Sequence, residues 1–235
     1  MKFGSLIANE DVSFNIHENE IVSLIGPNGA GKTTLFNCIT GFYKPFSGKT
    51  IYLGKDITNL PPHRICKLGI TRTFQIVKTL NEMTVKENVM TGAFLTTRNR
   101  KEAEESAEEI LNITGLYKKK DVLGANLTIA DRKRVEIARA LATKPRILML
   151  DECMAGLNQT EIKEVMNLIL QLKDQGLSLL IVEHIMEAIM PISDNVVVLN
   201  AGRKIAEGKP EDVVNNEEVI KAYLGVKYHA KSKKS

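Results

Sequence analysis

The chain has 235 residues, 43% of them hydrophobic and 26% charged, which is enough to bury a core without disulfides or a structural metal. Its three cysteines lack the spacing of a zinc site or a disulfide framework, and its apolar runs are far shorter than the ~20 residues of a bilayer span. The net charge of +4 comes from lysines in the last nine residues, so the body is neutral, which argues against a nucleic-acid-binding protein.

In the first part of the chain, short apolar runs alternate with helical patterns. Residues 21–25 form a buried-strand pattern, and a helix is predicted over 32–40, with a glycine-rich loop between the two. Another strand is predicted over 49–53. A helix over 61–68 begins with two prolines and stops before a glycine, as helices commonly do. The first unit of the chain is therefore a strand, a loop and a helix.

The pattern changes between about residues 82 and 144, where only helices are predicted. They span residues 85–93, 98–113 and 131–143, and the last has an apolar face. After residue 145 the alternation resumes, with a helix over 160–174 and strands over 147–150, 177–182, 195–199 and 203–206. Strands that alternate with helices imply an α/β fold, in which a mostly parallel sheet carries helices on both faces.

These patterns predict one domain over residues 1–226. Its core would be formed by about 1–81 and 145–226, and a helical subdomain by about 82–144. Residues 227–235 carry four lysines and no acid, which predicts a disordered basic tail; contact with anionic lipid headgroups is the alternative.

The glycine-rich loop matches a phosphate-binding motif. It fits G-x-x-x-x-G-K-[ST] directly after a strand and at the start of a helix, with Gly26, Pro27, Asn28, Gly29, Ala30, Gly31, Lys32, Thr33 and Thr34. Glycines let consecutive backbone N–H groups point at phosphate oxygens, and the helix N-terminus adds its dipole. Lys32 can reach the outer phosphates, and the Thr33 hydroxyl can bind Mg²⁺. We predict a nucleoside triphosphate as the ligand; a purely structural turn is the alternative.

Two carboxylates follow the predicted strand over 147–150. Ligands of parallel sheets bind beyond the carboxyl ends of the strands, so Asp151 and Glu152 should face the same crevice as the glycine loop. Asp151 is suited to hold Mg²⁺, usually through water, and Glu152 to orient and deprotonate an attacking water. The alternative is a strand that simply ends in solvated acids.

Four further features follow one another in the chain. They are Gln75 in the segment 72–75, the segment 127–134 before a helix, the segment 155–158 after the acidic pair, and His184 after a strand. In this order they resemble the nucleotide-binding subunit of an ATP-binding cassette (ABC) transporter, and the resemblance covers about residues 1–226. It implies a P-loop NTPase (RecA-like) core with an ABC-type helical subdomain.

Several stretches look more narrowly like the ATPases of branched-chain amino acid importers: 69–75, 82–85, 151–157 and 222–225. The resemblance also implies roles for single residues. Gln75 would couple the catalytic Mg²⁺ and water to the membrane partner, so that Gln75 joins Thr33 and Asp151 around the metal. His184 would bond the terminal phosphate of ATP, and Phe3 would stack on adenine. Because the chain starts close to Phe3, the first strand usual in the family is expected to be missing or clipped.

The largest departure from the family's pattern lies in the segment that most often reads Leu-Ser-Gly-Gly-Gln. Here it reads Leu127, Thr128, Ile129, Ala130 and Asp131, and its last four residues are candidates for contact with ATP. Thr128 keeps the hydroxyl, and with Asp131 it predicts a capping box that leaves outward N–H groups at the helix start. Ile129 narrows the approach of an anion to this helix end, and Asp131 adds a negative charge near the phosphates.

The resemblance implies an ATPase whose subunits close in pairs, head to tail, over two ATP molecules and reopen after hydrolysis. The expected partners are membrane-spanning permease subunits, a second ATPase subunit that is identical or homologous, and indirectly an external solute-binding protein; no nucleic acid is expected. Because Met1 opens no signal-peptide pattern, the expected location is cytoplasmic, peripheral on the inner face of the cell membrane.

Three other functions stay open at this stage. A soluble ABC-type ATPase acting on DNA or ribosomes would need a basic docking surface or a second cassette. A guanine-nucleotide switch would need an Asn-Lys-x-Asp motif, which the chain lacks. The altered segment at 127–131 also allows a hydrolysis-impaired nucleotide-binding subunit. The transported solute cannot be read from this chain, and urea or short amides are alternatives to amino acids.

Overall fold

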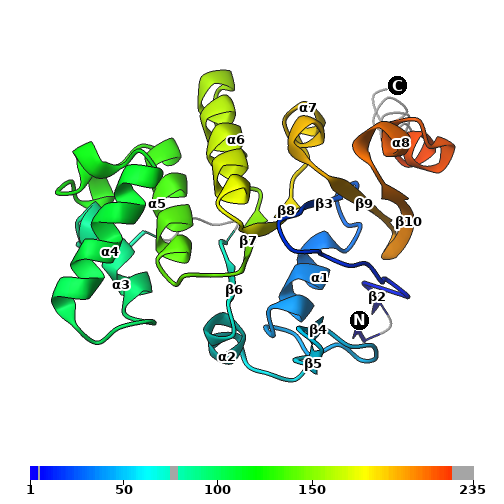
Figure 1. Cartoon of the computed structure of the whole chain (residues 1–235). Coiled ribbons are helices and arrows are strands. Elements are labelled where there is room, and N and C mark those ends of the chain that lie inside the picture. Colours follow the sequence, from blue (N-terminus) through cyan, green and yellow to red (C-terminus); the bar gives the residue numbers. More distant parts are fainter. Residues whose placement is uncertain (5, 75–78, 224–235) are drawn as a thin grey trace.

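The computed structural model describes residues 1–4, 6–74 and 79–223, and only the backbone of Phe3 and Leu6. Figure 1 shows a central sheet with helices on both of its faces and a separate group of helices beyond one edge. Within the described residues, no helix is both long enough and apolar enough to cross a membrane.

The main sheet has six strands in the described part of the chain. In spatial order they are β10 (Arg203–Gly208), β9 (Asn195–Asn200), β3 (Ile21–Ile25), β8 (Ser178–Val182), β7 (Ile147–Asp151) and β6 (Ile70–Arg72). All neighbours from β9 to β6 are parallel, and β10 runs antiparallel to β9. The predicted mostly parallel sheet is confirmed. Strands β3 and β8 are buried along their whole length, which explains why they read as continuous apolar runs.

Helices cover the sheet on both sides. They are α1 (Lys32–Ile39), α2 (Pro62–Lys67), α6 (Gln159–Asp174), α7 (Met186–Ile189) and α8 (Pro210–Val214). Successive residues of a strand point to opposite faces, so each strand contributes to two cores. Ile25 and Leu150 pack in the core that contains α6, whereas Leu24 and Met149 pack in the core that contains α1. This two-sided burial confirms the predicted α/β architecture.

Some elements differ from the prediction. The strand predicted over 49–53 shortens to β4 (Ile51–Tyr52), which pairs with β5 (Lys55–Asp56) in a hairpin of its own. A second hairpin joins β1 (Lys2–Phe3) to β2 (Leu6–Ile7). No pattern predicted β6, α7 or α8, because a strand of three residues and helices of four and five residues are too short to display a period.

Three helices form the group beyond β6: α3 (Val85–Ala93), α4 (Arg100–Ile113) and α5 (Ile129–Leu141). They have a small core of their own, in which Val89 of α3, Leu111 of α4 and Val135 of α5 are fully buried. The boundaries of this helical subdomain, about 82–144, stay a prediction.

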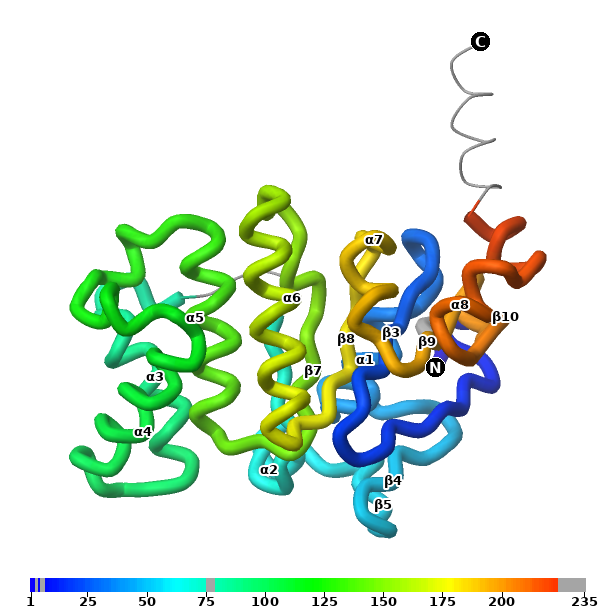
Figure 2. Tube along the Cα trace, turned by 45° about the horizontal axis from the view of Figure 1, so that its top comes forward, coloured from blue at the N-terminus to red at the C-terminus, as the bar shows by residue number. Residues whose placement is uncertain are grey.

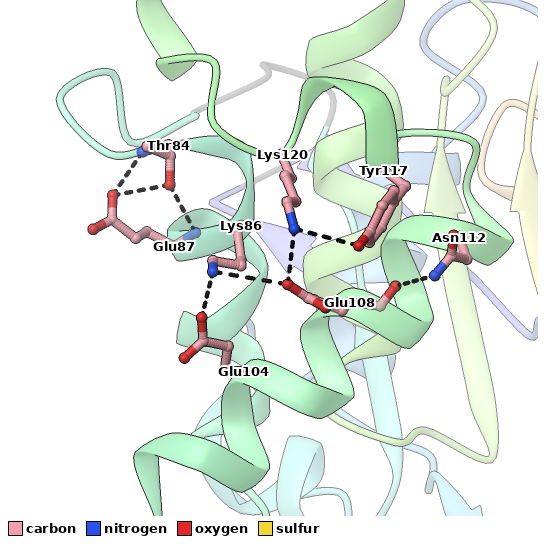
Figure 3. A network of polar contacts seen from close by, with 8 residues as sticks. All are labelled: Thr84, Lys86, Glu87, Glu104, Glu108, Asn112, Tyr117 and Lys120. Carbon is pink, nitrogen blue, oxygen red and sulfur yellow. Dashed lines mark hydrogen bonds and ion pairs between the residues drawn. The ribbon is translucent and has the colours of Figure 1, made fainter.

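A polar network on the surface of this group connects α3 with α4 (Figure 3). Thr84 caps α3, because its hydroxyl accepts a bond from the N–H of Glu87 while the Glu87 carboxylate accepts one from the N–H of Thr84. Glu108 of α4 pairs with both Lys86 and Lys120, at 3.8 and 3.1 Å. Ion pairs at the protein surface are worth about 0–1 kcal/mol each, so we expect the apolar core to supply most of the stability of this group.

Gly92 of α3 packs against the backbone of α5. A Cβ at this position would lie 2.2 Å from the carbonyl oxygen of Arg139. Alanine is about 1 kcal/mol better than glycine in an isolated helix, but here the added carbon must push two packed helices apart. We expect Gly92→Ala to lower the free energy of unfolding by about 1–3 kcal/mol, measured by urea titration. Glu109→Ala, on the exposed side of α4, is the control; an unchanged midpoint for Gly92→Ala would contradict this packing.

Candidate active site

Four neighbouring parallel strands, β3, β8, β7 and β6, end at one edge of the sheet. In Figures 1 and 2 the strands β3, β8 and β7 lie side by side. The segments that follow the carboxyl ends of parallel strands meet at the same edge. Here they are the glycine loop 26–31, the pair Glu183 and His184, the pair Asp151 and Glu152, and the pair Thr73 and Phe74. Residues far apart in the sequence are thus brought to one crevice.

The glycine loop follows a tight path that only glycine permits. Gly26, Gly29 and Gly31 have φ angles of 152°, 80° and 99°, in the region that side chains rarely adopt. A Cβ on Gly26 would lie 2.2 Å from the carbonyl oxygen of Leu199, and one on Gly31 would lie 2.3 Å from that of Ala8. Both conformation and packing therefore require glycine here, and the loop is held in a curled shape at the start of α1.

The side chain of Lys32 lies inside this curl. Its Nζ donates to the carbonyl oxygens of Gly26 at 2.7 Å and Pro27 at 3.1 Å. Burial lowers the pKa of Lys32, and the charges of Glu152 and Asp151 raise it. The amine is thus close enough to both carboxylates to sense their charge. It is ready to exchange two carbonyl partners for an anion, because charge-assisted bonds to phosphate are the stronger ones.

Asp151 is almost fully buried at the end of β7. Its Oδ2 accepts a bond from the Arg72 guanidinium at 2.9 Å, whereas its buried Oδ1 has no hydrogen-bond partner among the described residues. The pKa of Asp151 is raised, mainly by burial. The charge of Glu152 also raises it, whereas the charges of Arg72 and Lys32 lower it.

A buried carboxylate oxygen without a partner calls for a ligand. Mg²⁺ takes oxygen ligands and is usually bound by one or two carboxylates together with substrate phosphates. Asp151, together with the hydroxyl of Thr33, an exposed residue of the glycine-loop motif, therefore fits a nucleotide-bound magnesium ion. Among the described residues, no three His, Cys, Asp or Glu side chains gather to hold a metal.

Glu152 begins the turn after β7 with an unusual backbone. Its φ is 49°, which is uncommon for a residue with a side chain and is frequent at functional sites. Its N–H donates to the carbonyl of Val182 at 2.9 Å, and its carbonyl accepts from the Nζ of Lys133 at 2.8 Å. The carboxylate is half-buried. Contacts from β8 and α5 thus fix the backbone that carries this side chain.

His184 is exposed and follows the end of β8, as predicted. Its neighbour Glu183 is fully buried, and the Glu183 Oε1 accepts the N–H of Met154 at 2.7 Å. The pKa of Glu183 is raised, because the effect of burial exceeds the opposite effect of the bonds from the N–H groups of Met154 and His184. Glu183 therefore ties the segment after β8 to the segment after β7.

The tip of α5 carries the altered segment. Thr128 and Ile129 are exposed, and Ala130 and Asp131 are buried. The predicted capping box forms in one direction: the Thr128 hydroxyl accepts from the Asp131 N–H at 3.2 Å. The Asp131 carboxylate instead accepts from the Thr128 hydroxyl at 2.8 Å and from Lys119 at 2.6 Å. Burial raises the pKa of Asp131, but these bonds outweigh burial and leave it below its usual value.

Asp131 is consequently paired with a cation, Lys119. In Figures 1 and 2, α5 belongs to the group of helices beyond β6, whereas α1 lies against the sheet. Two other predicted residues lie outside what is described: Gln75 as a whole and the side chain of Phe3.

The sequence analysis assigned no role to three residues at the crevice: Arg72, Lys133 and Glu183. Each acts across strands or helices that are far apart in the chain. A buried charge next to a motif is a weak signal, because a lysine or arginine is normally read as surface.

The chain is similar to known proteins over nearly its whole length. Residues 9–155 match the family described as ABC transporter, and residues 203–229 match the family described as branched-chain amino acid ATP-binding cassette transporter. It is 45% identical to the high-affinity branched-chain amino acid transport ATP-binding protein LivG of Salmonella typhimurium, covering 96% of this chain and 94% of that one. It is 42% identical to BraF, a protein of the same description in Pseudomonas aeruginosa, with the same coverage.

Solved structures are similar too. A nucleotide-free ATP-binding cassette from an ABC transporter superimposes with a TM-score of 0.87 at 33% identity, covering 95% of each chain. A dimeric ATP-binding cassette in a post-hydrolysis state, bound to ADP and Pi, superimposes with a TM-score of 0.80 at 27% identity, covering 89% of this chain and 94% of that one.

Proposed function

The chain belongs to the ATP-binding subunits of ABC transporters, and we propose that it is the ATP-hydrolysing subunit of an importer for branched-chain amino acids. The observation that carries this proposal is the geometry at one sheet edge: a curled glycine loop surrounds the amine of Lys32, and Asp151 and Glu152, at the end of β7 on the far side of β8, act on that amine with their charges. A triphosphate needs this combination of backbone donors, a cation and a metal-binding carboxylate.

The phosphates of ATP would lie on residues 26–34. The loop and the first turn of α1 would offer their N–H groups, and Lys32 would leave the carbonyls of Gly26 and Pro27 to bind the outer phosphates. His184 would bond the terminal phosphate from the end of β8. Phe3 would stack on adenine.

Magnesium would be held by Thr33 and Asp151, with Gln75 as a further ligand, and it would neutralise the charge that develops on the phosphates. Glu152 would accept a proton from the attacking water. Its carboxylate is suited to this, because the backbone that carries it is fixed by Val182 and Lys133. General-base catalysis of this kind contributes about 10²–10⁴-fold to a rate.

The second half of each site would come from another ATPase subunit, identical or homologous. Residues 128–131, at the start of α5, would reach the terminal phosphate bound by the partner. ATP then favours the closed pair because its terminal phosphate is held from both sides, and hydrolysis removes that difference in affinity. Neutralisation of Asp131 by Lys119 leaves the helix dipole of α5 available to an anion.

Permease subunits would dock on the helical subdomain at about 82–144 and near Gln75, and convert closure into transport. The chain would then lie in the cytoplasm against the inner face of the cell membrane, with an external solute-binding protein acting through the permeases. An ATPase acting on DNA or ribosomes is not favoured, because the relatives are transport proteins over nearly their whole length.

Reconstitution tests this proposal. The chain is co-purified with its membrane partners, placed in proteoliposomes with the solute-binding protein, and assayed for leucine and urea uptake. ATP-dependent leucine uptake is expected, and ATP-dependent uptake of urea alone would contradict the proposed solute. Thr128→Arg should slow ATP hydrolysis and uptake by about 100-fold, because it blocks a donor site for the terminal phosphate. Gln171→Arg, at an exposed position of α6, is the matched control and should leave both rates unchanged.

A further inference from the structure

We propose that Arg72 is a positioning residue that holds Asp151 in the orientation needed to bind magnesium. The inference rests on the proposed function and goes beyond it, because Arg72 itself would touch neither nucleotide nor metal. It follows from the hydrogen bonds and ring contacts of the guanidinium.

Arg72 joins three elements of the crevice. Its Nη2 donates to Oδ2 of Asp151 at 2.9 Å, its Nη1 donates to Oδ1 of Asn37 at 2.5 Å, and its Nε donates to the carbonyl of Thr73 at 3.0 Å. Asn37 lies on α1, the helix that starts with Lys32, and Asp151 ends β7. A single planar group therefore links the helix of the glycine loop, the strand β6 and the carboxylate at the end of β7.

Aromatic rings enclose the same guanidinium. Its Cζ lies 4.9 Å from the ring centroid of Phe36, 5.5 Å from that of Phe42 and 4.8 Å from that of Phe74. The side chain is only 8% exposed. A guanidinium is planar, so it can stack on rings while its fork of donors binds several oxygens in its plane, and the ammonium of lysine has no such plane or fork. The surroundings thus select arginine by geometry as well as by charge.

This arrangement fixes the two oxygens of Asp151 in different roles. Oδ2 is committed to Arg72, and Oδ1 is buried with no hydrogen-bond partner among the described residues. The Thr73 hydroxyl also accepts the Asp151 N–H at 3.2 Å, so the backbone is held as well. Groups that orient a metal ligand are worth about 10–100-fold in metal affinity. Without Arg72, the carboxylate would be buried with its nearest cation removed and would be free to rotate.

The test separates nucleotide binding from magnesium binding. Calorimetry measures the affinity of the chain for a non-hydrolysable ATP analogue in EDTA, and then the affinity of the analogue-bound protein for Mg²⁺. For Arg72→Gln we expect the affinity for the analogue in EDTA to stay within about twofold of the wild-type value, and the Mg²⁺ affinity of the analogue-bound protein to fall about 10–100-fold. Arg203→Gln, which breaks an exposed ion pair with Glu10, is the matched control and should change neither value.

Arg72→Lys keeps the charge but loses the fork, and serves as well if Arg72→Gln does not fold. It should also lose Mg²⁺ affinity, by about tenfold or more. Wild-type Mg²⁺ affinity in either variant would overturn the inference. An equal loss of analogue affinity in EDTA and of Mg²⁺ affinity would also overturn it, because that would indicate a general disturbance of the site. If the unmodified chain bound no analogue at all, the proposed function would fail instead.

Discussion

Replacement of Lys32 by alanine is expected to remove most of the affinity of this chain for ATP. The Lys32 amine lies inside the glycine loop, bonded to two carbonyls that it would exchange for phosphate oxygens. A hydrogen bond to a charged group contributes about 1.5–3 kcal/mol, and 1.4 kcal/mol is tenfold in affinity, so Lys32→Ala should weaken ATP binding by about 10–100-fold. Equilibrium binding of a fluorescent ATP analogue measures this loss.

The control for this change is Lys163→Ala, which removes the same charge from an exposed position of α6 and should leave the affinity unchanged. The unfolding temperature of Lys32→Ala should not fall by much, because burial lowers the pKa of this amine and therefore disfavours its charged form in the folded chain. An unchanged affinity in a folded variant would show that the triphosphate does not bind in the glycine loop.

The second large effect is expected for Glu152→Gln, which replaces a carboxylate by an amide of the same shape. ATP hydrolysis should fall by about 10²–10⁴-fold, because the amide cannot accept a proton from water. ATP affinity should stay near the wild-type value, since the Lys32 cation remains in the loop. Phosphate release and analogue binding, measured on the same preparation, separate the two properties.

Glu187→Gln is the matched control, because this acid is exposed on α7 only a few residues from the crevice. It should hydrolyse ATP at the wild-type rate. If Glu152→Gln kept that rate as well, another group would have to be the base, and the role assigned to the turn after β7 would be wrong.

The parts of the fold that the sequence predicts well are those whose signals are local. The strand, glycine loop and helix over 21–40 follow from an apolar run, a motif and a closing glycine, and each can be read without knowing the rest of the chain. The strand at 147–150 is predicted for the same reason. The position of Asp151 and Glu152 at the edge shared with the loop needs one more rule, that ligands of parallel sheets bind at the carboxyl ends of their strands.

The parts that could not be predicted depend on pairings between distant segments. Strand β6 has three residues and becomes a strand only because Thr71 pairs with Leu148 of β7. That pairing also brings Arg72 next to Asp151, 79 positions along the chain. The neutralisation of Asp131 depends on Lys119, which lies on a separate turn before α5. None of these partners shares a local pattern with the residue it contacts.

The most direct test of the account is a structure of Glu152→Gln with ATP and Mg²⁺. We predict that the phosphates lie on the N–H groups of residues 28–34, that the Lys32 Nζ has moved from the carbonyls of Gly26 and Pro27 to a phosphate oxygen, and that the metal lies about 2.0–2.1 Å from the Thr33 hydroxyl oxygen. A nucleotide bound elsewhere, with Lys32 still on those two carbonyls and Asp151 turned away from the metal, would contradict it.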